Sequence, residues 1–134
     1  MPELAEFRAH EMQHRDIFWG ELKARKVARC RSYYFCGLGG YILGLITGLL
    51  GRSAILATTV AVERVVLHHL ELQITALQGK DEKAIVAIQK IIDDEKEHHD
   101  RSLEKIQRSS FYVKLLTPVV SASTETVIWF GMRL

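Results

Sequence analysis

Proline and cysteine are scarce in this sequence of 134 residues, which contains two of each. Pro2 lies at the very start, and no long stretch alternates β-branched with polar residues as a half-buried strand would. Cys30 and Cys36 have neither the number nor the spacing of a disulfide framework or a zinc site. We therefore expect an almost entirely helical protein with two free thiols, in a reducing compartment.

A strong net charge is also lacking. The formal charge is +2 at pH 7, and no basic patch is interleaved with aromatic residues, so nucleic acid is not expected as a partner. The composition, 48% hydrophobic and 25% charged, excludes a disordered tail. The length suits one domain, residues 1–134, and the heavily charged start does not resemble a signal peptide.

Charge is absent altogether from Ser32–Gly51, a run long enough to cross a membrane. Within it, Gly40, Gly44 and Gly48 are four residues apart and would form a smooth stripe where another helix can approach closely. The sequence is apolar again over Ser53–Val62. Two alternatives follow, namely a transmembrane span or a segment that lies in one leaflet of the membrane.

Apolar residues recur at helical spacing through most of the chain. The helices are expected at about Pro2–Arg31, from the uncharged run through a break at "LLGRSA" to Leu77, at about Asp81–Arg108, and within Lys114–Leu134. Gly79 suits a C-terminal cap, Asp81 suits the start of the next helix, and Pro118 suits a position near a helix start.

A Glu-x-x-His pattern occurs twice, as "EMQH" (Glu11 to His14) and as "EKEH" (Glu95 to His98). Residues three apart are neighbours on a helix, so each pair offers a carboxylate and an imidazole to one point. The flanking residues on both faces are apolar. A third apolar face carries Glu63 within "AVERVVLHH".

A buried ionised carboxylate without a partner costs several kcal/mol, so three of them need a common explanation. Two divalent cations provide one, as in ferritin-like di-iron bundles built from two glutamates and two Glu-x-x-His pairs. A single Glu-x-x-His would more often be a solvated face, but two copies in apolar stripes with a glutamate between them favour metal. His10 is interpreted as a surface residue. Other polar residues either are solvated or orient a ligand by hydrogen bonding; these are His68, His69, His99 and Asp100.

Four segments resemble those of the demethoxyubiquinone hydroxylases, the ferritin-like di-iron monooxygenases of ubiquinone biosynthesis. They are "EMQH", "GGYILGLITGLLG", "TTVAVERVVLHH" and "DDEKEHHD", and the resemblance extends from about Glu6 to Leu134. It implies an all-α, ferritin-like helical bundle with a hydrophobic, membrane-associating segment. It also implies hydroxylation of the quinone ring of a demethoxyubiquinone-type polyprenyl intermediate.

The same resemblance implies a ligand set for two iron ions. The family's metal ligands fall on Glu11, His14, Glu63, Glu95 and His98. The histidine that accompanies these ligands in the family falls on His69, and the tyrosine that usually follows it is replaced by Leu70.

The chain departs from the family pattern at its start. Family members carry another helix before the first Glu-x-x-His, with a fourth glutamate in a "GE-(Y/F)-GA" motif, and we expect only a partial bundle without that helix. Glu3 and Glu6 share a helix with Glu11 and are poor substitutes. A second protomer of a homo-oligomer or a partner protein would supply the helix, or the site is incomplete. A truncated, non-catalytic quinone-binding or scaffold protein at the membrane is the alternative function; iron storage fits the apolar surface poorly.

The implied reaction uses dioxygen and an external electron donor, since no Gly-x-Gly-x-x-Gly fingerprint for a nicotinamide or flavin is present. A polyprenyl quinone substrate would explain the apolar segment at about Tyr33–Val62, which we expect to make peripheral membrane contact. We favour this over a span because Glu63 follows the segment closely and must reach the metal site. The expected location is the cytoplasmic face of a bacterial inner membrane or the matrix face of the mitochondrial inner membrane.

Overall fold

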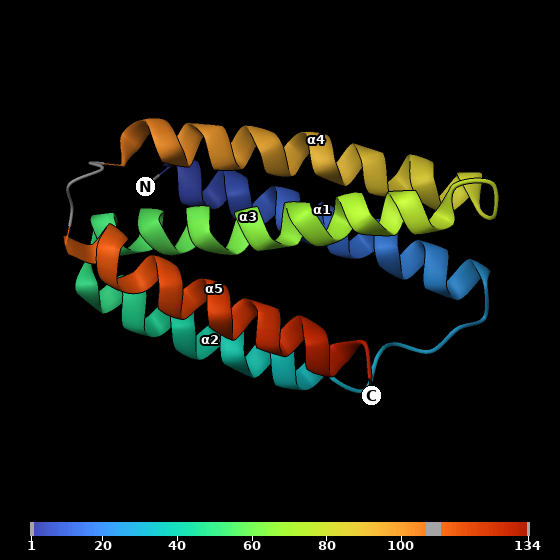
Figure 1. Ribbon diagram of the computed structural model, residues 1–134, viewed down its shortest axis with the longest axis horizontal. Helices are drawn as coiled ribbons and strands as arrows, with labels where there is room; N and C mark the ends of the chain where they lie inside the picture. Colours follow the sequence, from blue (N-terminus) through green and yellow to red (C-terminus); the bar gives the residue numbers. More distant parts are fainter. Residues whose placement is uncertain (1, 107–110, 134) are drawn as a thin grey trace. The chain divides into compact units, whose positions relative to one another are not determined.

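The computed structural model describes residues 2–106 and 111–133, and every regular element in these ranges is an α-helix. The helices are α1 (Pro2–Ala24), α2 (Tyr33–Leu50), α3 (Arg52–Leu77), α4 (Glu82–Lys105) and α5 (Phe111–Gly131) (Figure 1). The prediction of an all-α protein is confirmed.

Helix α1 ends at Ala24, earlier than the predicted Arg31. Lys26 adopts a left-handed conformation, with φ at 54°. The backbone N–H of Lys26 bonds to the carbonyl of Lys23, and the N–H of Val27 bonds to that of Leu22. This is the Schellman arrangement that closes a helix, and it usually places glycine where this chain has Lys26. The sequence therefore carries no obvious signal for the end of α1.

The predicted turn between α3 and α4 is confirmed. Leu77 is the last residue of α3, and Gly79 has φ at 71°. The Asp81 carboxylate accepts a hydrogen bond from the backbone N–H of Ala84 at 3.1 Å, as an N-cap does. The predicted break at "LLGRSA" also occurs, since Gly51 separates α2 from α3 with φ at 93°.

Helix α5 differs from the prediction because it begins at Phe111, seven residues before Pro118. Pro118 lies inside the helix and has no N–H to donate to the carbonyl of Lys114. The predicted break at "RSSFY" falls mostly outside the described residues.

The chain divides into two compact units, and the prediction of a single domain stays a prediction. The first unit contains α1, the end of α3 from Leu67 and most of α4. Here α1 runs antiparallel to α4 (Figure 1), with His10 opposite His98 and Arg25 in an ion pair with Asp81. The buried apolar side chains of this unit are Leu70, Ile88, Ile91 and Ile92.

The second unit contains α2, the first part of α3, the end of α4 and α5. Its buried apolar residues lie mainly on α3 and are small or β-branched; they include Ala54, Ala57, Val60 and Ala61. In α2, no atom lies within 4 Å of a Cβ built on Gly40, Gly44 or Gly48, leaving aside the helix's own nearby backbone. Within the described part of the chain, the glycine stripe does not mark the close helix contact that we expected.

The side chains of α2 are mostly exposed. Tyr34 is 81% exposed and Leu49 is 82% exposed, although the helix contains no charged residue. Among the described residues, α2 is the one helix whose length and composition would allow it to cross a membrane. Only 6% of this helix is buried inside the structure. Helix α5 adds exposed Phe111, Trp129 and Phe130 in the same unit.

Candidate metal centre

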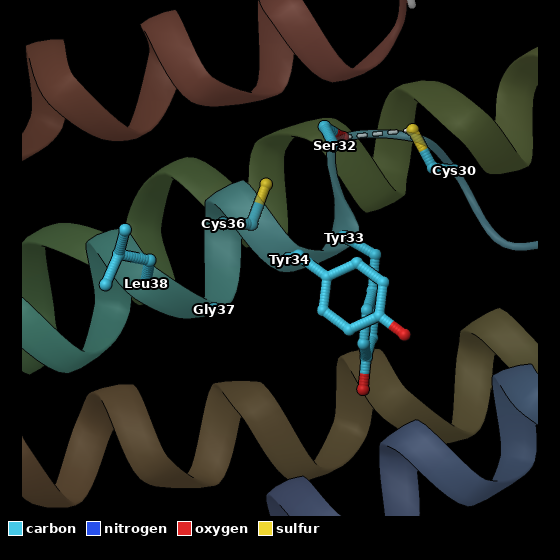
Figure 2. A pocket seen from close by; sticks show the side chains of 7 residues that line it. All are labelled: Cys30, Ser32, Tyr33, Tyr34, Cys36, Gly37 and Leu38. Atoms are coloured by element: carbon cyan, nitrogen blue, oxygen red, sulfur yellow. Dashed lines mark hydrogen bonds between the residues drawn. The ribbon is translucent and has the colours of Figure 1, made fainter.

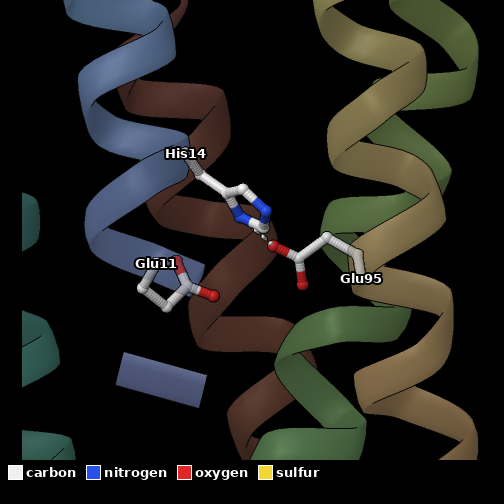
Figure 3. Close-up of side chains that lie close together, drawn as sticks. All are labelled: Glu11, His14 and Glu95. Carbon is white, nitrogen blue, oxygen red and sulfur yellow. Dashed lines mark ion pairs between the residues drawn. The ribbon is translucent and has the colours of Figure 1, made fainter. Parts of the chain in front are cut away.

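The two Glu-x-x-His segments lie opposite each other on α1 and α4 of the first unit. Glu11 and His14 occupy adjacent turns of α1, because residues three apart share a helix face. Glu95 continues the buried stripe of Ile88 and Ile91 on α4. Figure 3 shows the side chains of Glu11, His14 and Glu95 converging from the two helices. Their candidate ligand atoms all lie within 4.8 Å of one another.

This cluster combines burial with negative charge. His14 and Glu95 are each 4% exposed, while Glu11 is exposed. Burial, followed by the negative charge of Glu11, raises the pKa of Glu95 to about 7, although His14 acts in the opposite direction. The Nδ1 atom of His14 lies 3.2 Å from Oε1 of Glu95. A divalent cation would favour the ionised form of Glu95, so this set of carboxylate and imidazole donors fits a metal ion.

His98 is completely buried, at 0% exposure. Its Nε2 lies 2.7 Å from Nδ1 of His10, and the two ring planes differ by 9°. The ring of Phe7 lies against the His98 ring, with 4.3 Å between centroids. Burial is the largest cause that lowers the pKa of His98, and this favours the neutral imidazole that metal binding requires.

Two residues of this cluster were missed by the sequence interpretation. His10 was expected at the surface, but it is half-buried and contacts His98. Asp94 was not singled out, yet its carboxylate accepts a hydrogen bond from Nε2 of His14 at 3.0 Å. Both immediately precede the glutamate of a Glu-x-x-His segment, in "HEMQH" and "DEKEH". That shared position is the signal that could have identified them.

The other predicted site residues lie on α3. Glu63 is 7% exposed and belongs to the second unit. His69 is half-buried in the first unit, with its ring 5.7 Å from that of His68 between centroids. The roles of Glu63 as a ligand and of His69 beside the ligands stay predictions.

Two pockets of the second unit are lined entirely by described residues. One of about 400 Å³ lies among α3, α4 and α5 and is lined mainly by apolar side chains, with Arg64 and Thr117 as its polar members; the others are Val60, Leu103, Ile106 and Val113. A more open pocket of about 630 Å³ lies at the start of α2, where Figure 2 shows Cys30, Tyr33 and Tyr34 among its lining residues.

In the α2 pocket, Sγ of Cys30 lies 3.0 Å from Oγ of Ser32. Hydrogen bonding by the Ser32 side chain and backbone lowers the pKa of the Cys30 thiol. Cys30 and Cys36 are both free thiols, of which Cys30 is exposed.

Comparison with known proteins gives consistent matches. Residues 1–131 match the family described as "Ubiquinone biosynthesis protein COQ7". The mitochondrial NADPH-dependent 3-demethoxyubiquinone 3-hydroxylase of Bos taurus is 36% identical over 104 residues, which cover 75% of this chain and 48% of that protein. The protein of the same name from Homo sapiens is 34% identical, with 71% and 46% covered. That from Dictyostelium discoideum is 30% identical, with 98% and 62% covered. The chain spans about half the length of the curated relatives it matches.

Proposed function

We propose that this chain, which belongs to the family of the ubiquinone biosynthesis protein COQ7, forms the metal-binding and membrane-facing part of a demethoxyubiquinone hydroxylase. The relatives are named 3-demethoxyubiquinone 3-hydroxylases, and the family match over residues 1–131 includes both Glu-x-x-His segments. Under this proposal, the residues of the chain support oxygen chemistry on a quinone ring.

The observation that carries this proposal is the cluster of Glu11, His14 and Glu95 between α1 and α4. Without a cation, burial and the charge of Glu11 oppose ionisation of Glu95, whereas a divalent metal would stabilise all three side chains as ligands. We assign two iron ions to the full ligand set of Glu11, His14, Glu63, Glu95 and His98. When bound, the iron pair would supply the activation of dioxygen, which amino-acid side chains cannot perform.

The proposed reaction breaks one ring C–H bond and forms one C–O bond. One oxygen atom of dioxygen enters the ring and the other leaves as water, which requires two electrons and two protons. The electrons must come from an external donor, and the relatives are named as NADPH-dependent. His14 and His98 would bind as neutral imidazoles, while Glu95 would give up its proton when the metal enters.

The substrate would be a polyprenyl quinone taken from a membrane. The exposed apolar surfaces of α2 and α5 are of the kind that marks membrane or protein contact. The largely apolar pocket containing Arg64 and Thr117 offers space for a hydrophobic ligand. We propose peripheral contact through about Tyr33–Val62, on a bacterial or mitochondrial inner membrane; the relatives named above are mitochondrial.

Membrane contact can be tested with sealed liposomes. The chain should float with the liposomes, and protease added outside should cleave it without any fragment being protected inside. Cleavage sites accessible from both faces of the bilayer would contradict peripheral contact and indicate that α2 spans it.

The function itself is tested by metal analysis of the full chain. The parent protein should bind Fe(II) anaerobically and consume oxygen when exposed to an oxygen pulse, and Glu95→Ala should abolish both. Glu97→Ala is the matched control, because Glu97 is exposed on the same helix. Light scattering during loading would show whether iron binding is accompanied by association of a second copy of the chain.

Three outcomes of this experiment would count against the hydroxylase. Folded parent protein that binds no iron would favour the scaffold or quinone-binding function. Iron that is bound but does not react with oxygen would exclude an oxygenase formed by this chain alone. Equal iron binding by the parent and Glu95→Ala would place the metal elsewhere.

A further inference from the structure

In each Glu-x-x-His segment, the residue just before the glutamate makes a side-chain hydrogen bond to the other helix. His10 precedes Glu11 on α1, and its Nδ1 lies 2.7 Å from Nε2 of His98 on α4. Asp94 precedes Glu95 on α4, and its Oδ2 lies 3.0 Å from Nε2 of His14 on α1. The two contacts correspond to each other. In each of them, the residue before the glutamate of one segment contacts the histidine of the segment on the other helix.

The Asp94 contact has one possible direction. An ionised carboxylate can only accept a hydrogen bond, so Nε2 of His14 carries the hydrogen. In a neutral imidazole the other nitrogen then holds a lone pair. That nitrogen is Nδ1, which lies 3.2 Å from Glu95 within the proposed metal cluster. Asp94 therefore fixes His14 in the tautomer that can bind metal through Nδ1.

The His10 contact has two possible directions, because each imidazole can donate or accept. The nitrogen atoms are only 2.7 Å apart, while the ring centroids are 4.9 Å apart and the planes nearly parallel. The rings therefore meet through their edges, in a geometry that aligns an N–H with a lone pair. If Nε2 of His98 donates the hydrogen bond, Nδ1 of His98 keeps a lone pair that can bind metal. If Nδ1 of His10 donates, Nε2 of His98 is the acceptor, and the hydrogen of the neutral His98 ring is on Nδ1, which then cannot bind metal.

We propose that His10 is a positioning residue that accepts a hydrogen bond from Nε2 of His98 and so holds the His98 lone pair on Nδ1 for a metal ion. This inference rests on the proposed metal site, but the tautomer can be measured without metal. The hydrogen-bonded partner of a histidine ligand commonly sets its tautomer and ring orientation. His98 is completely buried against Phe7, which restricts rotation of its ring and keeps Nε2 directed at His10.

His10 differs from Asp94 in the charge that it brings. A neutral imidazole accepts the hydrogen bond without adding a carboxylate to a cluster that already contains Glu11 and Glu95. Any acceptor of similar reach should therefore replace His10, whereas an apolar side chain should not. This distinguishes positioning by a hydrogen bond from simple packing against His98.

The test compares His10→Gln, which keeps an acceptor, with His10→Leu, which keeps bulk but removes it. Asp93→Ala is the control, because Asp93 is exposed on α4. In metal-free, ¹⁵N-histidine-labelled full chain, nitrogen chemical shifts should show His98 protonated on Nε2 in the parent, His10→Gln and Asp93→Ala. His10→Leu should show a mixture of tautomers. Anaerobic Fe(II) titration of the same proteins should show about 10- to 100-fold weaker binding for His10→Leu alone.

The inference would be overturned by hydrogen on Nδ1 of His98 in the parent. It would also be overturned if His10→Leu, shown to be folded by its circular dichroism spectrum, kept both the parental tautomer and the parental Fe(II) affinity. A third contradicting result would be that His10→Gln loses the parental tautomer and Fe(II) affinity as fully as His10→Leu does. A parent protein that binds no Fe(II) would instead overturn the proposed function, and with it the metal-binding purpose assigned to His10.

Discussion

Replacing Glu95 with glutamine should remove a pH dependence from the stability of the metal-free protein. Glu95 is 4% exposed, and burial together with the charge of Glu11 raises its pKa from 4.5 to about 7. A carboxyl group whose pKa is higher in the folded than in the unfolded state binds its proton more tightly when folded. Its contribution to stability is fully present below pH 4.5 and is lost as the pH rises through about 7.

The magnitude follows from the size of the shift. One pKa unit corresponds to about 1.4 kcal/mol, so the change from 4.5 to about 7 corresponds to a loss of about 3 kcal/mol in the free energy of unfolding. Most of this loss should occur between pH 4.5 and 7. At an ordinary urea sensitivity, it amounts to a fall of about 1–3 M in the urea midpoint.

The assay is urea unfolding followed by circular dichroism, in chelator-treated protein, at pH values from 4.5 to 8. Titrating groups that do not contact Glu95 contribute equally to parent and variant, so the quantity of interest is the difference between the two midpoints. Glu95→Gln should gain stability relative to the parent as the pH rises. Glu97→Gln, at an exposed position of the same helix, should follow the parent throughout. If the difference in urea midpoint between Glu95→Gln and the parent stayed the same from pH 4.5 to 8, ionisation of Glu95 would not reduce stability and the reasoning would be refuted.

Three further predictions concern the core, a turn and a hydrogen bond of the first unit. Ile91→Ala should lower the free energy of unfolding by about 2–5 kcal/mol in urea unfolding, because Ile91 is 2% exposed and its loss leaves a cavity; a change below about 0.5 kcal/mol would contradict the described core. Gly79→Ala should cost about 1 kcal/mol in the same assay, since φ at 71° is unfavourable for a residue with a Cβ, and an unchanged midpoint would contradict that conformation. Asp94→Ala should weaken Fe(II) binding about 10- to 100-fold by removing the acceptor for His14, whereas Asp93→Ala, at an exposed position, should bind as the parent does.

The sequence predicts the helices well where local signals are strong. Gly79 and Asp81 mark the turn between α3 and α4, and Gly51 marks the break between α2 and α3, because glycine favours positive φ and aspartate caps a helix. The end of α1 was not predicted, since Lys26 adopts the left-handed conformation without being glycine or asparagine. Pro118 was predicted to lie near the start of a helix, but α5 begins before it and continues through it.

The candidate site could be predicted only in part, because a periodic sequence pattern describes one helix at a time. Helical spacing shows that Glu11 shares a face with His14 and that Glu95 shares one with His98. It does not show which residues meet across two helices, because that depends on their register. The contact between His10 and His98 follows from the antiparallel register of α1 and α4, which single-helix periodicity does not determine.

The most direct test of the central claim is X-ray absorption spectroscopy of iron bound to the full chain, comparing the parent with His14→Ala. If the cluster between α1 and α4 holds iron, the parent spectrum should contain imidazole scattering, and its amplitude per iron should fall in His14→Ala. Iron without imidazole ligands in the parent, or an identical spectrum in His14→Ala, would contradict the claim.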